Sequence, residues 1–470
     1  MPPTLRSFSY VQPEEASLLG APLLTGSYMD KSLTLQCENL NRAVSRLNLI
    51  SSHDALLILR HSLSAPKLNY ILRAAPCAGH SALNAFDNSL KNAISCIINV
   101  DLSPSQWLQA SLPVSLGGLG VRSVSMLAPS AFLASAAETK ELQDIILSAD
   151  SDSLDPEFLR IEDIWYTLSN ASRSEISVSN LSQKRLDSAV ANCLHSEILK
   201  TCSSKPVEMA RFLAVSAPHA GDWLNALPIS SCGLRLDDEA IRIAVGLRLG
   251  TRLCVPHLCL CGARVDEFGT HGLSCKQSAG RASRHSFIND LIWRALRKAQ
   301  VPACREPLGL SRTDGKRPDG VTQIPWSNGK CITWDVTVTD TLAPSHLHTS
   351  QSVAGSVAEA AARKKEAKYS CLPSSYDFVP IAIETLGPVN ESGIKFLDAI
   401  GSRTISITGE LRERSYLWQR LSVAVQRFNA VCFRGTFDDQ DASQLRSWKL
   451  HGDSDDSQAA TISRAVIESD

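Results

Sequence analysis

The chain has 470 residues, which predicts two to four domains because one domain usually takes about 100–200 residues. The composition of 44% hydrophobic and 20% charged residues excludes a collagen-like or wholly disordered chain. Lysine and arginine total 47 against 48 acidic residues, so no overall basic excess indicates a nucleic-acid partner. No apolar run reaches the roughly 18 residues of a membrane span, and no signal peptide is recognisable, so we expect an intracellular protein.

The first half of the chain is expected to be helical because its apolar residues recur at helical spacing. The expected helical stretches are 33–75, 83–98, 126–137, 181–200, 207–214 and 238–247. Residues 148–180 are rich in serine and aspartate and sparse in apolar residues, which suggests a surface connection with a domain boundary near residue 149.

The pattern changes after Cys254. A helix is expected over 282–299 and another, rich in alanine, over 353–369. Two strand candidates at 330–339 and 377–384 flank the second of these helices. A strand, a helix and a strand in this order indicate a mixed α/β unit with a crossover helix, followed by a final helix over 416–428.

These patterns predict an α+β protein in five segments. They are a helical region 1–149, a helical linker 150–245, a cysteine-rich segment 246–280, a mixed α/β domain 281–437 and a disordered acidic tail 438–470. The tail carries eight acidic and three basic residues, whereas 281–369 carries fourteen basic and eight acidic residues. That local excess of six could neutralise phosphates, or it could belong to a solvated lysine-rich helix face.

The cysteine-rich segment offers Cys259, Cys261, His271 and Cys275 with the spacing C-x-C-x9-H-x3-C. Zinc takes four thiolate or imidazole ligands in a tetrahedron, and so short a segment would draw its folding energy from the metal. Because one residue between the first two cysteines is short for such a site, Cys254 is a reserve ligand. No acidic general base stands at a recognisable spacing, which favours structural zinc, and buried thiols without a metal are the alternative.

Acidic residues follow this segment in an order that suits a divalent metal. Asp319 lies in the sequence RPDG, Asp335 follows in WDVTV after fifteen intervening residues, and Glu306 lies upstream. Converging carboxylates can hold Mg²⁺ and support phosphodiester hydrolysis. An isolated Pro-Asp-Gly is more often a turn, so the ordered combination carries the prediction.

A basic residue is also needed beside the acids. In the simplest motif of this kind, a lysine two residues after the second acid shares its face of the strand. Thr337 occupies that position and cannot supply the charge. The helix with the sequence RKKEAKY supplies Lys365 and Lys368, which lie on one face, so either one of them completes the site or the site is inactive.

The order of these motifs resembles the C-terminal part of site-specific non-LTR retrotransposon proteins, which carry a restriction-enzyme-like endonuclease of the PD-(D/E)xK class. The resemblance covers about 245–437. The helical region resembles the reverse-transcriptase thumb and linker of such polyproteins, over 56–76 and 115–135. No aromatic-x-Asp-Asp polymerase motif precedes that region, so we expect the downstream half of a longer element without polymerase activity of its own.

The resemblance implies a nuclear endonuclease that nicks target DNA, so that the freed 3′-hydroxyl primes reverse transcription of the element RNA. Asp319 and Asp335 would ligate Mg²⁺, Glu306 would be a further acid, and Lys365 or Lys368 would stabilise negative charge or orient water. The zinc would be structural. The alternatives are an inactive remnant that only binds nucleic acid, and a structural host protein with incidental motifs, which would hold no zinc.

Overall fold

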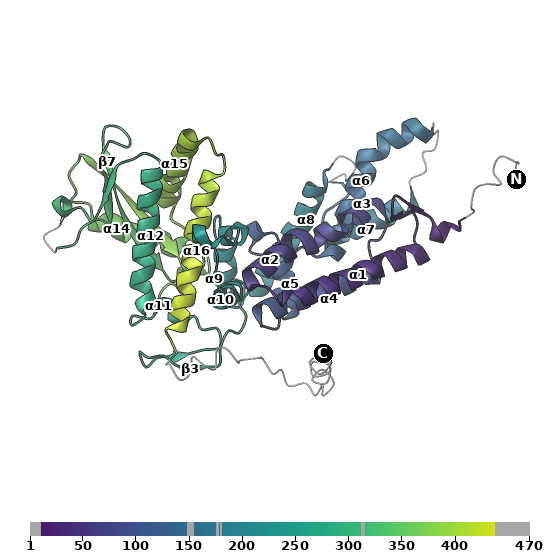
Figure 1. Ribbon diagram of the computed structural model, residues 1–470, viewed down its shortest axis with the longest axis horizontal. Coiled ribbons are helices and arrows are strands. Elements are labelled where there is room, and N and C mark those ends of the chain that lie inside the picture. Colours follow the sequence, from purple (N-terminus) through teal and green to yellow (C-terminus); the bar gives the residue numbers. More distant parts are fainter. Residues whose placement is uncertain (1–10, 148–154, 175–177, 179–180, 312–314, 438–470) are drawn as a thin grey trace, which may run out of the picture.

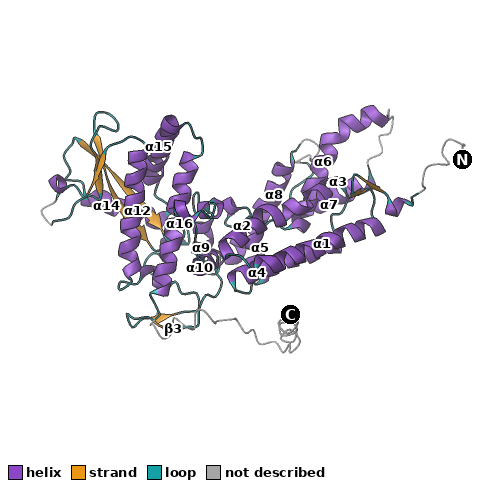
Figure 2. Cartoon of the chain, viewed as in Figure 1, coloured by secondary structure: helices purple, strands orange, loops and turns teal. Residues whose placement is uncertain are grey.

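The computed structural model describes residues 11–147, 155–174, 178, 181–311 and 315–437. The predicted boundary near residue 149 and the predicted acidic tail lie outside these residues. The fold is a mixture of helices and small sheets, as an α+β protein requires (Figure 2). A helical half formed by the earlier part of the described chain lies at one end, and a half that contains the main sheet lies at the other (Figure 1). None of the described helices is both long and apolar enough to span a membrane.

Helices form nearly all of the helical half. Their bounds are α1 (Ser27–Leu47), α2 (Ser52–Ile58), α3 (Ala65–Ala74), α4 (Ser81–Ile98), α5 (Pro104–Ser111), α6 (Val124–Leu147), α7 (Pro156–Ser169), α8 (Gln183–Cys202), α9 (Pro206–Val215) and α10 (Asp238–Leu249). A π-helical turn (Leu59–Leu63) joins α2 to α3, and a small hairpin of β1 (Ser17–Leu18) and β2 (Ala21–Pro22) precedes α1. The predicted helical stretches are thus confirmed.

Helix α7 corrects the prediction that 148–180 is a surface connection. The Asp155 side chain accepts a hydrogen bond from the Glu157 amide and caps the helix, and a proline follows at its first position. Ile161 and Trp165 are completely buried, and the Trp165 indole donates to the Leu186 carbonyl. Further apolar side chains of α7 pack around these two, namely Phe158, Ile164 and Leu168. Helix α7 therefore docks through an apolar face at helical spacing.

The sheet half contains one four-stranded sheet in the order β5-β6-β7-β8. Its strands are β5 (Ala303–Arg305), β6 (Gly320–Thr322), β7 (Cys331–Thr339) and β8 (Tyr376–Glu384). Strands β7 and β8 are parallel, and the crossover between them contains α13 (Leu347–Ser350) and α14 (Ser356–Lys368), which confirms the predicted strand-helix-strand unit. Strands β5 and β6 add to the edge in antiparallel orientation.

The two faces of this sheet are covered differently. Helices α12 (Ala279–Lys298), α15 (Glu391–Thr408) and α16 (Glu413–Arg434) pack on one face, where Trp334 and Val336 of β7 enter an apolar core. Helix α14 covers the other face through small residues, Ala358 and Ala362, which pack against Ala382 of β8. Because side chains alternate along β7, Asp335 points to the face that α14 covers.

Helix α16 belongs to both halves. Its residues Leu417, Trp418 and Leu421 lie in the core of the sheet half. Further along, Val423 and Phe433 lie in a second core, which runs through the helical half and on to Leu273. The predicted boundaries at 245 and 280 do not divide this second core.

Candidate functional site

Two groups of side chains have donor atoms close enough to hold a metal ion, within the part of the chain that the structure describes. The first, which we call the Cys/His group, consists of Cys259, Cys261, His271 and Cys275. The second, the Asp/His group, consists of His285, Asp319 and Asp335. In each group all donor atoms lie within 4.8 Å of one another.

The Cys/His group is built on a hairpin and a helical turn. Strands β3 (His257–Leu258) and β4 (Arg264–Val265) form the hairpin that carries the first two cysteines, and α11 (His271–Ser274) begins at the histidine. Gly262 has a φ of +85°, which suits glycine in the tight turn between the strands. A Cβ at Gly269 would lie 2.1 Å from the Phe433 ring, so this glycine lets the segment pack against α16.

The spacing of the donor atoms suits a tetrahedral ion. The sulfur atoms of Cys259 and Cys275 are 3.7 Å apart, and the Cys261 sulfur is 3.2 Å from His271 Nε2. Bonds of about 2.3 Å to zinc place two tetrahedral thiolates about 3.8 Å apart. A hydrogen bond from the Ala263 backbone is the largest cause that lowers the pKa of Cys261, to about 7, which favours the thiolate. The group could therefore hold a metal such as zinc.

Cys254 lies outside this group, which corrects its prediction as a reserve ligand. It is buried, its sulfur donates to the Asp266 carbonyl at 3.2 Å, and burial raises the pKa of its thiol to about 12. His257 also lies outside it and contacts the residues that follow α16, with Nε2 3.0 Å from the Thr436 hydroxyl. The single residue between Cys259 and Cys261 is sufficient because the hairpin turn brings their sulfurs to the same side.

The Asp/His group brings together residues from three elements. His285 lies on α12, Asp319 directly precedes β6, and Asp335 lies in the middle of β7. Asp319 Oδ2 accepts a 2.6 Å hydrogen bond from the Val336 amide and lies 3.0 Å from His285 Nε2. This contact with Asp319 is the main cause that raises the pKa of His285.

The glycine of RPDG lets β6 approach β7. A Cβ on Gly320 would lie 2.0 Å from the Trp334 ring, which packs directly over this residue. The Trp334 indole donates to Asn289 Oδ1 at 2.9 Å, and the Asn289 amide donates to the Asp319 carbonyl at 3.3 Å. The Pro-Asp-Gly sequence is thus the entry to a strand, and Asn289 fixes it to α12.

Helix α14 supplies the lysines. Lys365 Nζ lies 2.5 Å from Asp335 Oδ1, and Lys368 Nζ lies 3.8 Å from Asp335 Oδ2. The buried Tyr369 hydroxyl donates to the Arg317 carbonyl at 2.7 Å and so attaches the end of α14 to the RPDG sequence. The structure therefore brings Asp319, Asp335 and Lys365 to one place.

Glu306 is not brought into this group. Its backbone amide donates to the Asp319 carbonyl at 2.9 Å, but its side chain is 61% exposed and forms an ion pair with Arg317. Its φ of +49° marks an abrupt end of β5, after which the carboxylate turns outward. The Glu306 backbone thus lies next to Asp319, but the Glu306 carboxylate points away from Asp319 and Asp335.

His285 was missed by reasoning from the sequence. It lies 34 residues before Asp319, and no recognised spacing connects the two. One signal was available, because His285 and Asn289 are four residues apart and so share a face of an expected helix, beside the apolar stripe. A polar pair at that position indicates that the face meets something other than the core.

The basic excess of residues 281–369 is partly used inside the domain. Arg284 is buried and donates to Asn429, and Lys330 pairs with an aspartate on β8. On α14, Arg363 and Lys364 are exposed beside the inward-facing lysines. The positive charge that could contact a phosphate backbone is thus smaller than the number of basic residues in 281–369 suggests. Part of it lies on α14, at Arg363 and Lys364.

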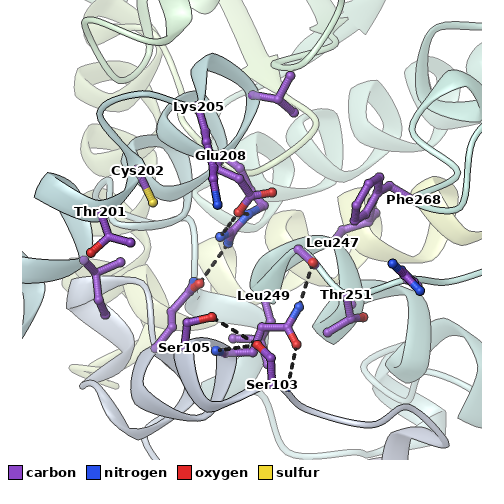
Figure 3. Close-up of a pocket in the computed structure, with 18 of the residues that line it drawn as sticks. Ser103, Ser105, Thr201, Cys202, Lys205, Glu208, Leu247, Leu249, Thr251 and Phe268 are labelled. Atoms are coloured by element: carbon purple, nitrogen blue, oxygen red, sulfur yellow. Dashed lines mark hydrogen bonds and ion pairs between the residues drawn. The ribbon is translucent and has the colours of Figure 1, made fainter. Parts of the chain in front are cut away.

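A separate pocket of about 870 Å³ lies in the helical half, between α5, α8, α9 and α10 (Figure 3). Glu208 and Lys205 line it, and Phe268 of the Cys/His segment closes one side. Arg211 in its wall is paired with Glu208 at 2.7 Å and with Gln109 at 3.0 Å. This pocket contains no member of the Asp/His group.

No protein family model matches the chain, and no curated protein matches it. The function is therefore argued from the two groups of side chains and from their surroundings.

Proposed function

We propose that the sheet half is a metal-dependent DNA endonuclease of the PD-(D/E)xK class, within the C-terminal part of a non-LTR retrotransposon protein. The observation that carries this proposal is the convergence of Asp319, Asp335 and Lys365 from three separate elements. A turn aspartate and a solvated lysine helix, the plain alternatives, would not bring these side chains together.

The position of Lys365 explains how the site works without a lysine in β7. Thr337 shares the face of Asp335 but carries no charge. Helix α14 covers this face through small alanines, which let the helix axis approach closely enough for Lys365 to reach Asp335. The lysine thus comes from the crossover helix and ends beside the same carboxylate.

The residues of the site have distinct roles in this proposal. Asp319 and Asp335 would hold a divalent cation such as Mg²⁺, which when bound supplies charge neutralisation at the phosphate and activation of water. Lys365 places a fixed cation at the edge of the site, where it stabilises negative charge that develops on the phosphate. Tyr369 is a positioning residue, because it fixes α14 to the backbone that precedes Asp319.

The Cys/His group would be a structural zinc knuckle beside this site. All four donors come from protein side chains, which leaves no open position on a tetrahedral ion for chemistry. The segment packs on α16 through Gly269 and Phe433, and α16 in turn packs on α12, which carries His285. A bound metal would therefore stabilise α16 and α12, the helices that position the nuclease site.

The proposal is tested by nicking of supercoiled plasmid DNA with Mg²⁺. Asp319→Asn and Asp335→Asn should each abolish nicking, whereas Asp377→Asn should keep it, because Asp377 lies on β8 outside the Asp/His group. DNA binding by the folded wild-type protein without any nicking would overturn the enzyme and leave a nucleic-acid-binding remnant.

A further inference from the structure

We infer that His285 is a third ligand of the cation at Asp319 and Asp335, and that the site consequently prefers a transition ion such as Mn²⁺ to Mg²⁺. This inference rests on the proposed function and deepens it, because it names the cation. It also gives a role to the histidine that no sequence motif indicated.

The first support is the distance between the donor atoms. His285 Nε2 and Asp319 Oδ2 are 3.0 Å apart, and both lie within 4.8 Å of an Asp335 oxygen. Two ligands at a right angle, each about 2.1 Å from an ion, are about 3.0 Å apart. The pair is thus already spaced as neighbouring ligands of one ion.

The second support is the way in which α12 is held. Asn289, one turn after His285, bonds both the Asp319 carbonyl and the Trp334 indole. One residue before His285, Arg284 is buried and bonds Asn429 of α16 at 3.0 Å. The imidazole therefore comes from a backbone that is fixed on both sides, as an ordered ligand requires.

The third support is the charge of the group. Two carboxylates balance a divalent ion, and Lys365 already pairs with Asp335. An imidazole that gives up its proton when the ion binds adds a donor without adding a third negative charge. His285 thus fills the place that the sequence assigned to Glu306, whose carboxylate is turned outward.

The choice of ion follows from the donor atoms. Mg²⁺ prefers oxygen ligands, whereas imidazole nitrogen suits first-row transition ions. Two carboxylates alone favour Mg²⁺. Addition of His285 shifts the preference toward Mn²⁺.

The test is Mn²⁺ binding to the full-length, zinc-loaded protein, followed by electron paramagnetic resonance. Bound Mn²⁺ should show nitrogen coupling from an imidazole, and competition should show that Mg²⁺ binds at least about tenfold more weakly. The His285→Gln variant should lose the nitrogen coupling and bind Mn²⁺ at least about tenfold more weakly, with little change for Mg²⁺. His348→Gln, an exposed histidine of the same half, is the matched control.

Two further measurements keep the outcomes separate. The double variant Asp319→Asn, Asp335→Asn identifies Mn²⁺ bound elsewhere, and circular dichroism checks that each variant folds. Mn²⁺ bound without nitrogen coupling, and equally well by His285→Gln, would overturn the inference. Plasmid nicking is scored independently, so nitrogen coupling without nicking would support the metal site while rejecting the nuclease, and nicking without coupling would do the reverse.

Discussion

The Cys/His group and the Asp/His group both gather metal-binding side chains, but they are assembled in different ways. The two outermost ligands of the Cys/His group, Cys259 and Cys275, are only sixteen positions apart. The Asp/His group joins His285 to Asp319 across 34 positions, and the lysine beside it comes from a further crossover helix. The first group is a property of one segment, and the second is a property of the whole sheet half.

This difference indicates which substitutions should lower the stability of the fold and which should lower the rate of the proposed reaction. The Cys/His segment adds only a few buried apolar side chains to the second core, among them Val265 and Leu273, so a bound metal would supply part of its folding energy. A group spread over α12, β6 and β7 is held by the core beneath it, so its own donors are available for a reaction. Loss of a Cys/His ligand should therefore reduce the stability of the fold. Loss of an Asp/His residue should reduce activity while the protein stays folded.

The largest effect on stability is expected from Cys275→Ala. The variant should lose its zinc and several kcal/mol of folding free energy, because the segment loses the ion that closes it. Elemental analysis and thermal unfolding measure the two effects.

Cys254→Ala is the matched control, because this buried cysteine lies outside the Cys/His group. It should retain zinc. Zinc loss in this control, or a wild-type protein that holds no zinc, would contradict the local nature of the site.

Lys365→Ala should have the largest effect on chemistry while the protein stays folded. Removal of a fixed cation from a reaction site costs on the order of 10²–10³ in rate. Lys395→Ala, at an exposed lysine of α15 outside the site, should change the rate by less than about twofold. Initial rates of plasmid nicking measure both, and a larger loss in Lys368→Ala would transfer the role to Lys368.

The helical half offers a pH-dependent effect on stability that involves neither the Cys/His group nor the Asp/His group. Buried His53 accepts a hydrogen bond from the Leu236 amide, and burial lowers its pKa to about 4. A histidine whose folded pKa is lowered stabilises the fold fully above its unfolded pKa of about 6.5 and loses this stabilisation as the pH falls toward 4. The loss should reach about 3 kcal/mol.

His53→Asn isolates this effect, because the asparagine oxygen can still accept from Leu236 but does not titrate in this range. The melting temperature of the wild type should fall more between pH 7 and pH 4.5 than that of the variant. Parallel pH curves for the two proteins would show that His53 is not the titrating group.

The smallest effect is expected from Tyr369→Phe. Loss of its hydrogen bond to the Arg317 carbonyl should cost about 1 kcal/mol of stability and reduce nicking by less than about tenfold. Tyr376→Phe at the start of β8 is the matched control. If Tyr369→Phe leaves both the melting temperature and the nicking rate unchanged, Tyr369 does not position α14.

The sequence predicted those parts of the fold that repeat a pattern over many residues. Helices such as α4 and α12 and the strands β7 and β8 were found because their apolar periods are long. Helix α7 was missed because the serine- and aspartate-rich residues on either side of it outweighed its own apolar period in the reading of 148–180. Strands β5 and β6, at three residues each, are too short to show a period, and α15 was not foreseen.

The same distinction applies to the site. The four ligands of the Cys/His group follow from their spacing, because one hairpin and one turn bring them together. The convergence of Asp319, Asp335 and Lys365 required the parallel crossover, which the order of elements indicated. The placement of His285 required the packing of α12 against β5 and β7, and the outward turn of Glu306 required the positive φ at that residue. The His285/Asn289 pair is only a partial signal for the first, and no pattern in the sequence reports the second.

The long helix α16 has a mechanical consequence. Since its two ends are embedded in two different cores, the sheet half could swing against the helical half only by bending or unravelling this helix. Helix α16 therefore links the sheet half to the helical half as one continuous element (Figure 1). Under the proposed nuclease function, DNA that also contacts the helical half would be cut at a constant distance from that contact.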